Sequence, residues 1–148
     1  MRFPIGIQNF RTLREDGYLY IDKTELIYKL VDTSCYYLLS RPRRFGKSLL
    51  VSTLEAYFQG KKEQFKGLAM ERLEKDWTAR PVFHLDLNVG KYESTQSLLD
   101  TLNEALTVWE QEYGAAEAER NVGLRFKGGC ATCLRKDRSQ GRDIGGRV

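Results

Sequence analysis

The residues of this chain best suited to chemistry are Gly46, Lys47 and Ser48, which follow a run of basic residues. A glycine lets the backbone approach a phosphate closely, a lysine ammonium reaches the β- and γ-phosphates, and a serine hydroxyl ligates Mg²⁺. These three residues end the phosphate-loop pattern G-x-x-x-x-G-K-[ST], which lies between a strand and a helix. Arg41 stands at the position of the first glycine, so the match is to the second half of the pattern. The expected ligand is a nucleotide held by its phosphates together with Mg²⁺, and Ser48 is the expected metal ligand.

The rest of the loop is expected to surround the same anion. Backbone amides from Arg44 to Ser48, at the N-terminus of the following helix, would cradle the phosphates. Arg43 and Arg44 would either add charge at the phosphates or lie in solvent, and the sequence favours neither. The predicted nucleotide-binding residues are Arg43, Arg44, Phe45, Gly46, Lys47, Ser48 and Leu49. The alternative interpretation is a solvated basic turn capped by a helix.

The sequence predicts both elements that must hold such a loop. Residues 35–40 form a continuous apolar run, which is typical of a strand buried on both faces of a parallel sheet. From Lys47 onward, apolar residues share one helical face, and Gly60 is a typical stop for that helix. The loop would thus join a buried strand to an amphipathic helix.

The remaining elements extend this alternation. Residues 18–21 and 82–89 have strand patterns, and residues 65–73 and 95–113 have helical spacing. A further helix is expected after Asp22 and Thr24, which are candidate N-caps, with Glu25 completing an approximate capping box. The order predicts an α/β fold, with a mainly parallel sheet and flanking helices as in P-loop NTPases.

Charge and composition exclude several classes of protein. The formal net charge is +4, but residues 123–148 carry seven Lys/Arg and two Asp/Glu, so the first 122 residues sum to −1. A generally basic nucleic-acid-binding domain is therefore not indicated. No run approaches the roughly 20 apolar residues of a membrane helix, and the N-terminus has no secretory pattern. Three cysteines make no disulfide framework, so a cytoplasmic protein without membrane contacts is expected.

The run YYLLSRPRRFGKSL over residues 36–49 resembles the AAA-ATPase-like family of bacterial proteins, whose members carry RPRRFGKSL in place of a full Walker A pattern. Residues 17–24, 57–61 and 81–87 are similar to the same family, and the resemblance covers about residues 3–127. It implies a P-loop ATPase core in which arginine at the first glycine position is normal. It also implies longer relatives, many of which end in a nuclease-like domain that would connect them to nucleic acid.

A P-loop ATPase also needs a Walker B strand, which ends in the acid that holds Mg²⁺. Residues 82–86 end in Asp86, but His84 interrupts the apolar run and Leu87 stands where glutamate is wanted. A polar position on a half-exposed strand is the favoured interpretation of Asp86, and a sheet-face position that of His84. The resemblance implies that the Walker B strand follows the helix at 95–113. The strand is therefore expected to be absent, and the sheet incomplete.

The chain is predicted to divide into an ATPase-like portion, residues 1–127, and an irregular basic tail, residues 128–148. The tail is either a disordered, possibly nucleic-acid-binding segment or the product of a shifted reading frame. Under the second hypothesis the chain is a truncated family member, and the Cys130–Cys133 pair is an accident of frame. In either case a zinc or redox site is disfavoured, because no second ligand pair accompanies it.

Three functions follow from these observations. The leading one is an ATP-binding domain fragment whose complete hydrolysis is doubtful, because no Walker B acid is assigned. The second is a non-catalytic nucleic-acid-binding module that uses Arg41, Arg43, Arg44 and the tail. The third is an inert truncated product. Sequence alone leaves the oligomeric state open.

The nucleotide sequence of the gene tests the shifted frame. With synonymous codons, residues 128–148 read one base later can spell EVVQHAYEKTGRKVAILVDEY, which ends as a Walker B strand does. If the shifted Tyr codon is completed and an Asp codon follows, the original frame meets a stop directly after Val148. We expect sequencing to show this string in the neighbouring frame, and a gene that cannot encode it rejects the hypothesis.

Overall fold

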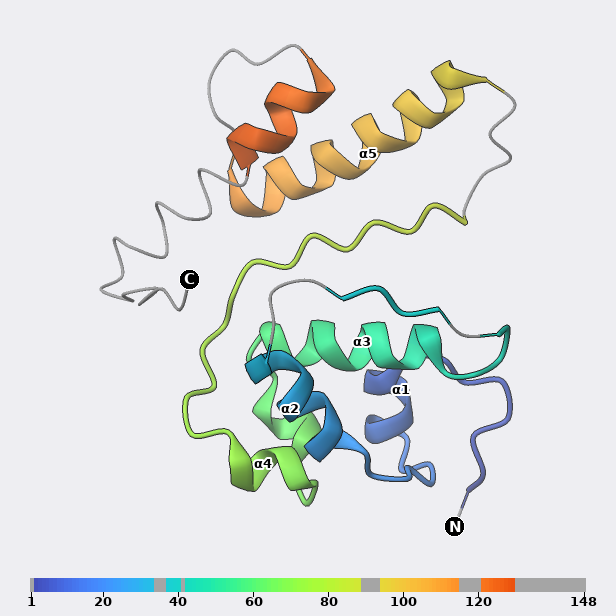
Figure 1. Cartoon of the computed structure of the whole chain (residues 1–148), viewed down its shortest axis with the longest axis vertical. Coiled ribbons are helices and arrows are strands. Elements are labelled where there is room, and N and C mark those ends of the chain that lie inside the picture. Colours follow the sequence, from blue (N-terminus) through green and yellow to red (C-terminus); the bar gives the residue numbers. More distant parts are fainter. Residues whose placement is uncertain (1, 34–36, 41, 89–93, 115–120, 130–148) are drawn as a thin grey trace. The chain divides into compact units, whose positions relative to one another are not determined.

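The computed structural model divides the chain into two compact units, Met1–Val82 and Phe83–Val148 (Figure 1). It describes residues 2–33, 37–40, 42–88, 94–114 and 121–129. None of the helices in these ranges is long and apolar enough to cross a membrane.

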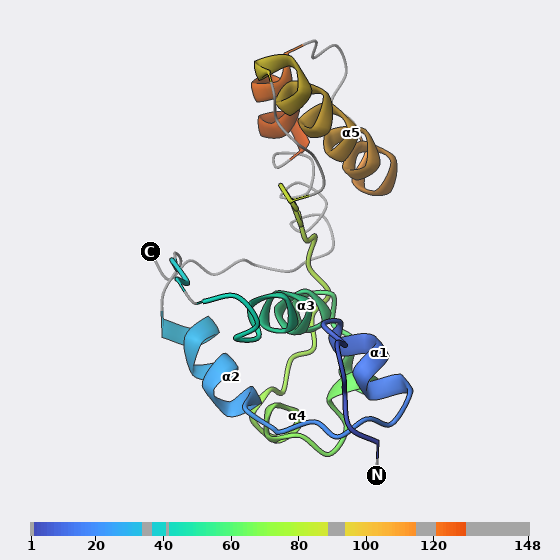
Figure 2. The same ribbon diagram turned by 90° about the vertical axis from the view of Figure 1, so that its right-hand side faces the viewer.

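The first unit is built from short helices. Figures 1 and 2 show α1 lying along α3, and α2 lying beside α4. The elements are α1 (Phe10–Glu15), α2 (Thr24–Thr33), α3 (Lys47–Phe58), the 3-10 helix η1 (Lys62–Phe65) and α4 (Ala69–Leu73).

The core of this unit is centred on Phe65, which is fully buried. Its ring centroid lies 4.9 Å from that of Phe10 in α1 and 5.1 Å from that of Trp77. Ile27, from α2, and Ala56, from α3, belong to the same buried cluster. One aromatic side chain from η1 therefore joins the helices into a single core.

Asp22 ties two helix N-termini together. One carboxylate oxygen accepts hydrogen bonds from the backbone N–H of Thr24 (2.8 Å) and from its hydroxyl (2.7 Å). The other accepts from the backbone N–H of Ala69 (2.7 Å). The hydroxyl of Thr24, which is fully buried, accepts from the N–H of Met70 (3.0 Å). Two side chains thereby satisfy amides at the starts of both α2 and α4.

The expected parallel sheet is wrong for this structure, because the described residues contain no β-strand. Residues 18–21 make only an isolated bridge, between Tyr18 and Arg2, and residues 37–40 and 82–88 lack regular structure. An apolar run marks a segment that could pair, but a strand forms only where a second segment supplies backbone partners in register. Among the described residues that partner is missing, and Leu38 is 97% exposed.

The predicted helices agree with the structure more closely than the predicted strands do. The helix after Asp22 is confirmed as α2, and that from Lys47 is confirmed as α3. The expected helix at 65–73 is shifted and split, since η1 and α4 are separated by a turn. The capping box with Glu25 is wrong, because this carboxylate pairs with Lys29 (2.7 Å).

The second unit contains α5 (Thr95–Tyr113), as predicted, and a helical segment at residues 122–129. Arg125 clamps this segment onto α5 with hydrogen bonds to Glu110, Asn103 and Thr107. The ring of Trp109 lies 5.0 Å from that of Phe83. The rest of the predicted tail, residues 130–148, lies outside the described residues.

The Asp22 contacts predict an acid-sensitive contribution to stability. Burial alone would raise the pKa of Asp22, but hydrogen bonds from Thr24 and Ala69 outweigh it and hold the pKa below its ordinary value of 3.8. The stabilisation is therefore present above about pH 4 and is lost as pH falls through the folded-state pKa. We expect Asp22→Ala to lower the free energy of unfolding by about 1–2 kcal/mol at pH 7 and by less in acid.

Urea unfolding followed by circular dichroism measures this difference. Asp32→Ala removes the same charge from an exposed position of α2 and is expected to change stability by no more than about 0.5 kcal/mol. Equal losses for the two variants, or a loss at Asp22 that does not depend on pH, would contradict the assignment.

Candidate functional site

The loop before α3 contains two residues in the left-handed region of backbone conformation. Among its described residues, Arg44 and Gly46 have positive φ angles, 68° and 73°, whereas Phe45 and Lys47 do not. Alternation of left- and right-handed residues turns successive N–H groups toward one concavity, and such concavities bind phosphate. Arg44 is the only described non-glycine residue with positive φ. The left-handed conformation of Arg44 is therefore a source of backbone strain in the loop.

The electrostatics of the loop favour an anion. Gly46 is the N-cap of the 12-residue α3 and makes no side-chain capping hydrogen bond. No acidic residue lies in the first turn, and the sequence has none between Asp32 and Glu55. The partial positive charge of the helix N-terminus therefore adds to that of the neighbouring basic side chains.

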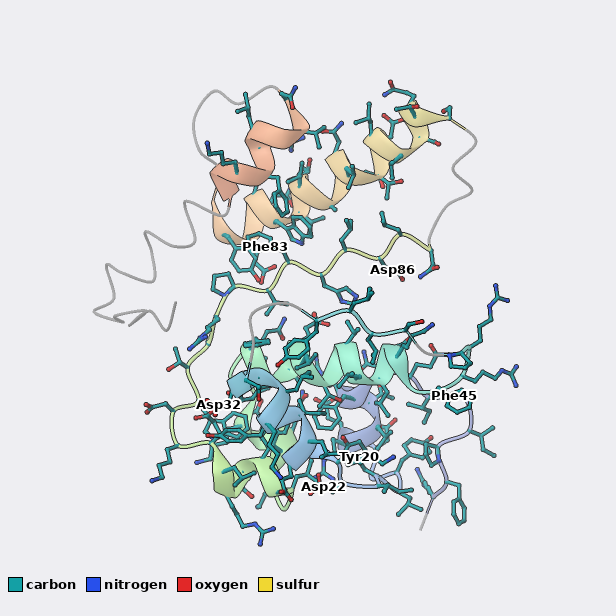
Figure 3. All side chains as sticks on the ribbon, in the orientation of Figure 1. Tyr20, Asp22, Asp32, Phe45, Phe83 and Asp86 are labelled. Carbon is teal, nitrogen blue, oxygen red and sulfur yellow. The ribbon has the colours of Figure 1, made fainter. Side chains whose placement is uncertain are left out.

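The side chains of the loop lie at the surface, while its end is anchored in the core. Arg43, Arg44, Gly46, Lys47 and Ser48 are exposed. Figure 3 labels Phe45, which is 65% exposed, at the turn that leads into α3. Leu49 is half-buried and packs against the Phe65 cluster. The predicted residues thus span the turn before α3 and the first three residues of that helix, whereas Arg41 lies outside the described residues.

An open groove of about 640 Å³ adjoins this loop. Its size is typical of small-molecule sites, and its lining is mostly apolar. Below it is called the apolar groove. It is lined by Phe3, Pro4, Leu13, Leu19, Tyr20, Ile21, Lys23, Leu26, Ile27, Leu30, Leu39, Phe45, Gly46, Leu49, Leu50 and Thr53.

Few polar side chains line the apolar groove, and two of them bond to each other. Burial raises the pKa of Tyr20, although its hydrogen bond with Thr53 acts in the opposite direction. The hydroxyl of Thr53, itself almost fully buried, donates its proton to the carbonyl of Leu49 (2.7 Å). The third is Lys23, an exposed cation at the rim.

The profile of the predicted AAA-ATPase family matches residues 4–141 of this sequence. The chain belongs to this family. An uncharacterized protein from the vnfD 5′ region of Azotobacter chroococcum mcd 1 is 41% identical over 127 residues. The match covers 84% of this chain and 24% of that relative, so the chain spans about a quarter of the relative's length. No solved structure matches.

In this AAA-ATPase family member, the carboxylate of Asp86 is hydrogen-bonded within a local turn. Its carboxylate accepts hydrogen bonds from the backbone N–H and the side-chain amide of Asn88, both at 2.9 Å. These bonds hold its pKa below the ordinary value. Asp86 and His84 are exposed on a segment without a strand, so the strand position expected for Asp86 and the sheet-face position expected for His84 are wrong. In the part of the chain that the structure describes, no three His, Cys, Asp or Glu side chains gather as a metal site.

Sequence reasoning missed the apolar groove and the strained residue. Tyr20, Ile21 and Leu26 were parts of a predicted strand and helix, and only the tertiary structure places them beside Phe45. The left-handed conformation of Arg44 carries no sequence signal, because arginine has no preference for it. For Gly46 the signal was present, since glycine is the default residue at positive φ.

Gly46 and Gly60 both have positive φ angles but differ in the space available for a side chain, which gives a testable difference in stability. Gly46→Ala is expected to cost about 1–2 kcal/mol of stability from backbone strain alone, because nothing lies within 4 Å of the added Cβ. Gly60 has φ 69°, and a Cβ there would lie 3.1 Å from backbone atoms of Trp77 and Ala79. Gly60→Ala should therefore cost more than Gly46→Ala.

Arg44→Gly provides the reverse change. It relieves the left-handed strain at the expense of added freedom in the unfolded chain, so a gain of up to about 1 kcal/mol is expected. Urea unfolding of the three variants compares them. A stable Gly46→Ala protein together with a destabilised Arg44→Gly protein would contradict the loop conformation described above.

Proposed function

We propose that residues 43–49 bind the phosphates of a nucleoside triphosphate together with Mg²⁺, and that ATP is a ligand of this site. The observation that carries the proposal is the pair of positive φ angles at Arg44 and Gly46, directly before a helix whose N-cap is a glycine. Backbone amides and helix dipole then point at one anion. The description of the family as predicted AAA-ATPases supports nucleotide as the class of ligand.

Each predicted residue has a physical role in this proposal. Lys47, at the first position of α3, would pair with phosphate oxygens, and the hydroxyl of Ser48 would ligate Mg²⁺. Bound Mg²⁺ would neutralise phosphate charge, which the protein alone offsets with its loop cations. Arg43 and Arg44 are exposed beside the turn and would add further positive charge.

The proposal is limited to binding. Hydrolysis needs the Walker B acid, which holds Mg²⁺. Asp86 is the residue that was considered for this role from the sequence. One carboxylate oxygen of Asp86 accepts hydrogen bonds from the backbone N–H and the side-chain amide of Asn88. The activity of the longer family proteins, including any action on nucleic acid, stays a prediction.

Calorimetric titration of the full chain with ATP and Mg²⁺ tests the proposal. We expect Lys47→Ala to weaken binding by about 10–100-fold, because a hydrogen bond to a charged group contributes about 1.5–3 kcal/mol. Ser48→Ala should weaken binding in Mg²⁺ and have little effect in EDTA. Lys62→Ala removes a cation from η1, which lies outside the loop, and serves as the matched control.

Two results would overturn the proposal. One is a folded chain that does not bind ATP. The other is unchanged affinity in Lys47→Ala. DNA binding with a steep salt dependence and no competition by ATP would instead favour the nucleic-acid-binding module, for which the exposed Arg43 and Arg44 are the supporting observation.

A further inference from the structure

We infer that the apolar groove holds the base of the bound nucleotide by burial alone, without recognition of its polar edge, so that ATP and GTP bind almost equally. This inference rests on the proposed function, since it takes the phosphates at the loop as the anchor. It assigns the ligand class as purine nucleoside triphosphates in general.

The apolar groove is continuous with the loop. Phe45, Gly46 and Leu49 line the groove and are also loop residues. A ligand whose phosphates lie against the amides at the start of α3 would therefore have its other end beside these side chains. Because nucleotides join an anionic and an aromatic end, they match this pair of neighbouring surfaces.

The groove exposes apolar side chains that a flat ring can cover. Ile21 is 72% exposed, Phe45 65% and Leu26 63%, and all three line the groove. Aromatic rings bury large apolar areas and stack favourably on other rings, as Phe45 would allow. The open shape and volume accommodate either purine.

Base discrimination requires polar groups, and the side chains of the groove offer few. Adenine and guanine differ in which edge atoms donate and which accept hydrogen bonds. A site built to bond such atoms rejects the wrong ligand strongly, whereas an apolar pocket discriminates weakly. The Thr53 hydroxyl donates its proton to the Leu49 carbonyl, and the ring of Tyr20 is half-buried against the Phe65 cluster. Lys23 has a flexible donor that can meet an acceptor on any base.

Titration of the full chain with ATP, GTP and inorganic triphosphate, each with Mg²⁺, tests the inference. We expect triphosphate to bind, both nucleotides to bind at least about tenfold more tightly, and their affinities to agree within about fivefold. A preference of more than about 50-fold for one purine would show that the site recognises the polar edge of the base, and would overturn the inference. If the nucleotides bind no more tightly than triphosphate, the base does not bind in the groove and the inference is overturned.

These outcomes are distinct from failure of the proposed function, in which none of the three ligands binds. A pair of matched variants locates the base. Ile21 lines the groove, whereas Ile5 is 91% exposed and does not line it. Ile21→Ser should weaken ATP and GTP binding by about threefold to tenfold and leave triphosphate binding unchanged. Ile5→Ser should change none of them, and equal effects of both variants would overturn the placement.

Discussion

Burial of Phe65 is the interaction on which the first unit depends. Its ring contacts those of Phe10 and Trp77, and the same cluster includes side chains from α2 and α3. The helices are short, and α1 and α4 have six and five residues. Helices of this length are marginal in water by themselves, so tertiary packing must stabilise them. The position of α3, and with it the loop before that helix, therefore follows from an aromatic contact in η1.

Polar groups at helix ends are treated in two ways in this unit. At α2 and α4, the Asp22 carboxylate and the Thr24 hydroxyl satisfy backbone amides. At α3, the N-cap is Gly46, which has no side chain to accept a hydrogen bond from the backbone. A side-chain cap satisfies backbone amides at the start of a helix and adds stability, which α3 does not obtain from its own N-cap residue.

The sequence predicted local structure well and pairing poorly. Helical spacing and terminal residues were sufficient for α2, α3 and α5, because a helix satisfies its backbone within one segment. The apolar run at 35–40 indicated a strand, but a sheet depends on partners far along the chain, and the described residues supply none. The candidate loop was predicted from Gly46, Lys47 and Ser48 alone, and its binding role stays a prediction. The groove beside them could not, since Ile21 and Phe45 become neighbours only through tertiary packing.

The two tryptophans give the chain an optical reporter in each unit. Trp77 packs on Phe65 and Tyr57 in the first unit, with ring centroids 5.1 and 5.9 Å apart, and Trp109 packs on Phe83 in the second. Replacing either tryptophan with phenylalanine leaves emission from the other unit alone. Whether the units lose their structure in one cooperative step or in two can then be read from a single fluorescence signal at a time.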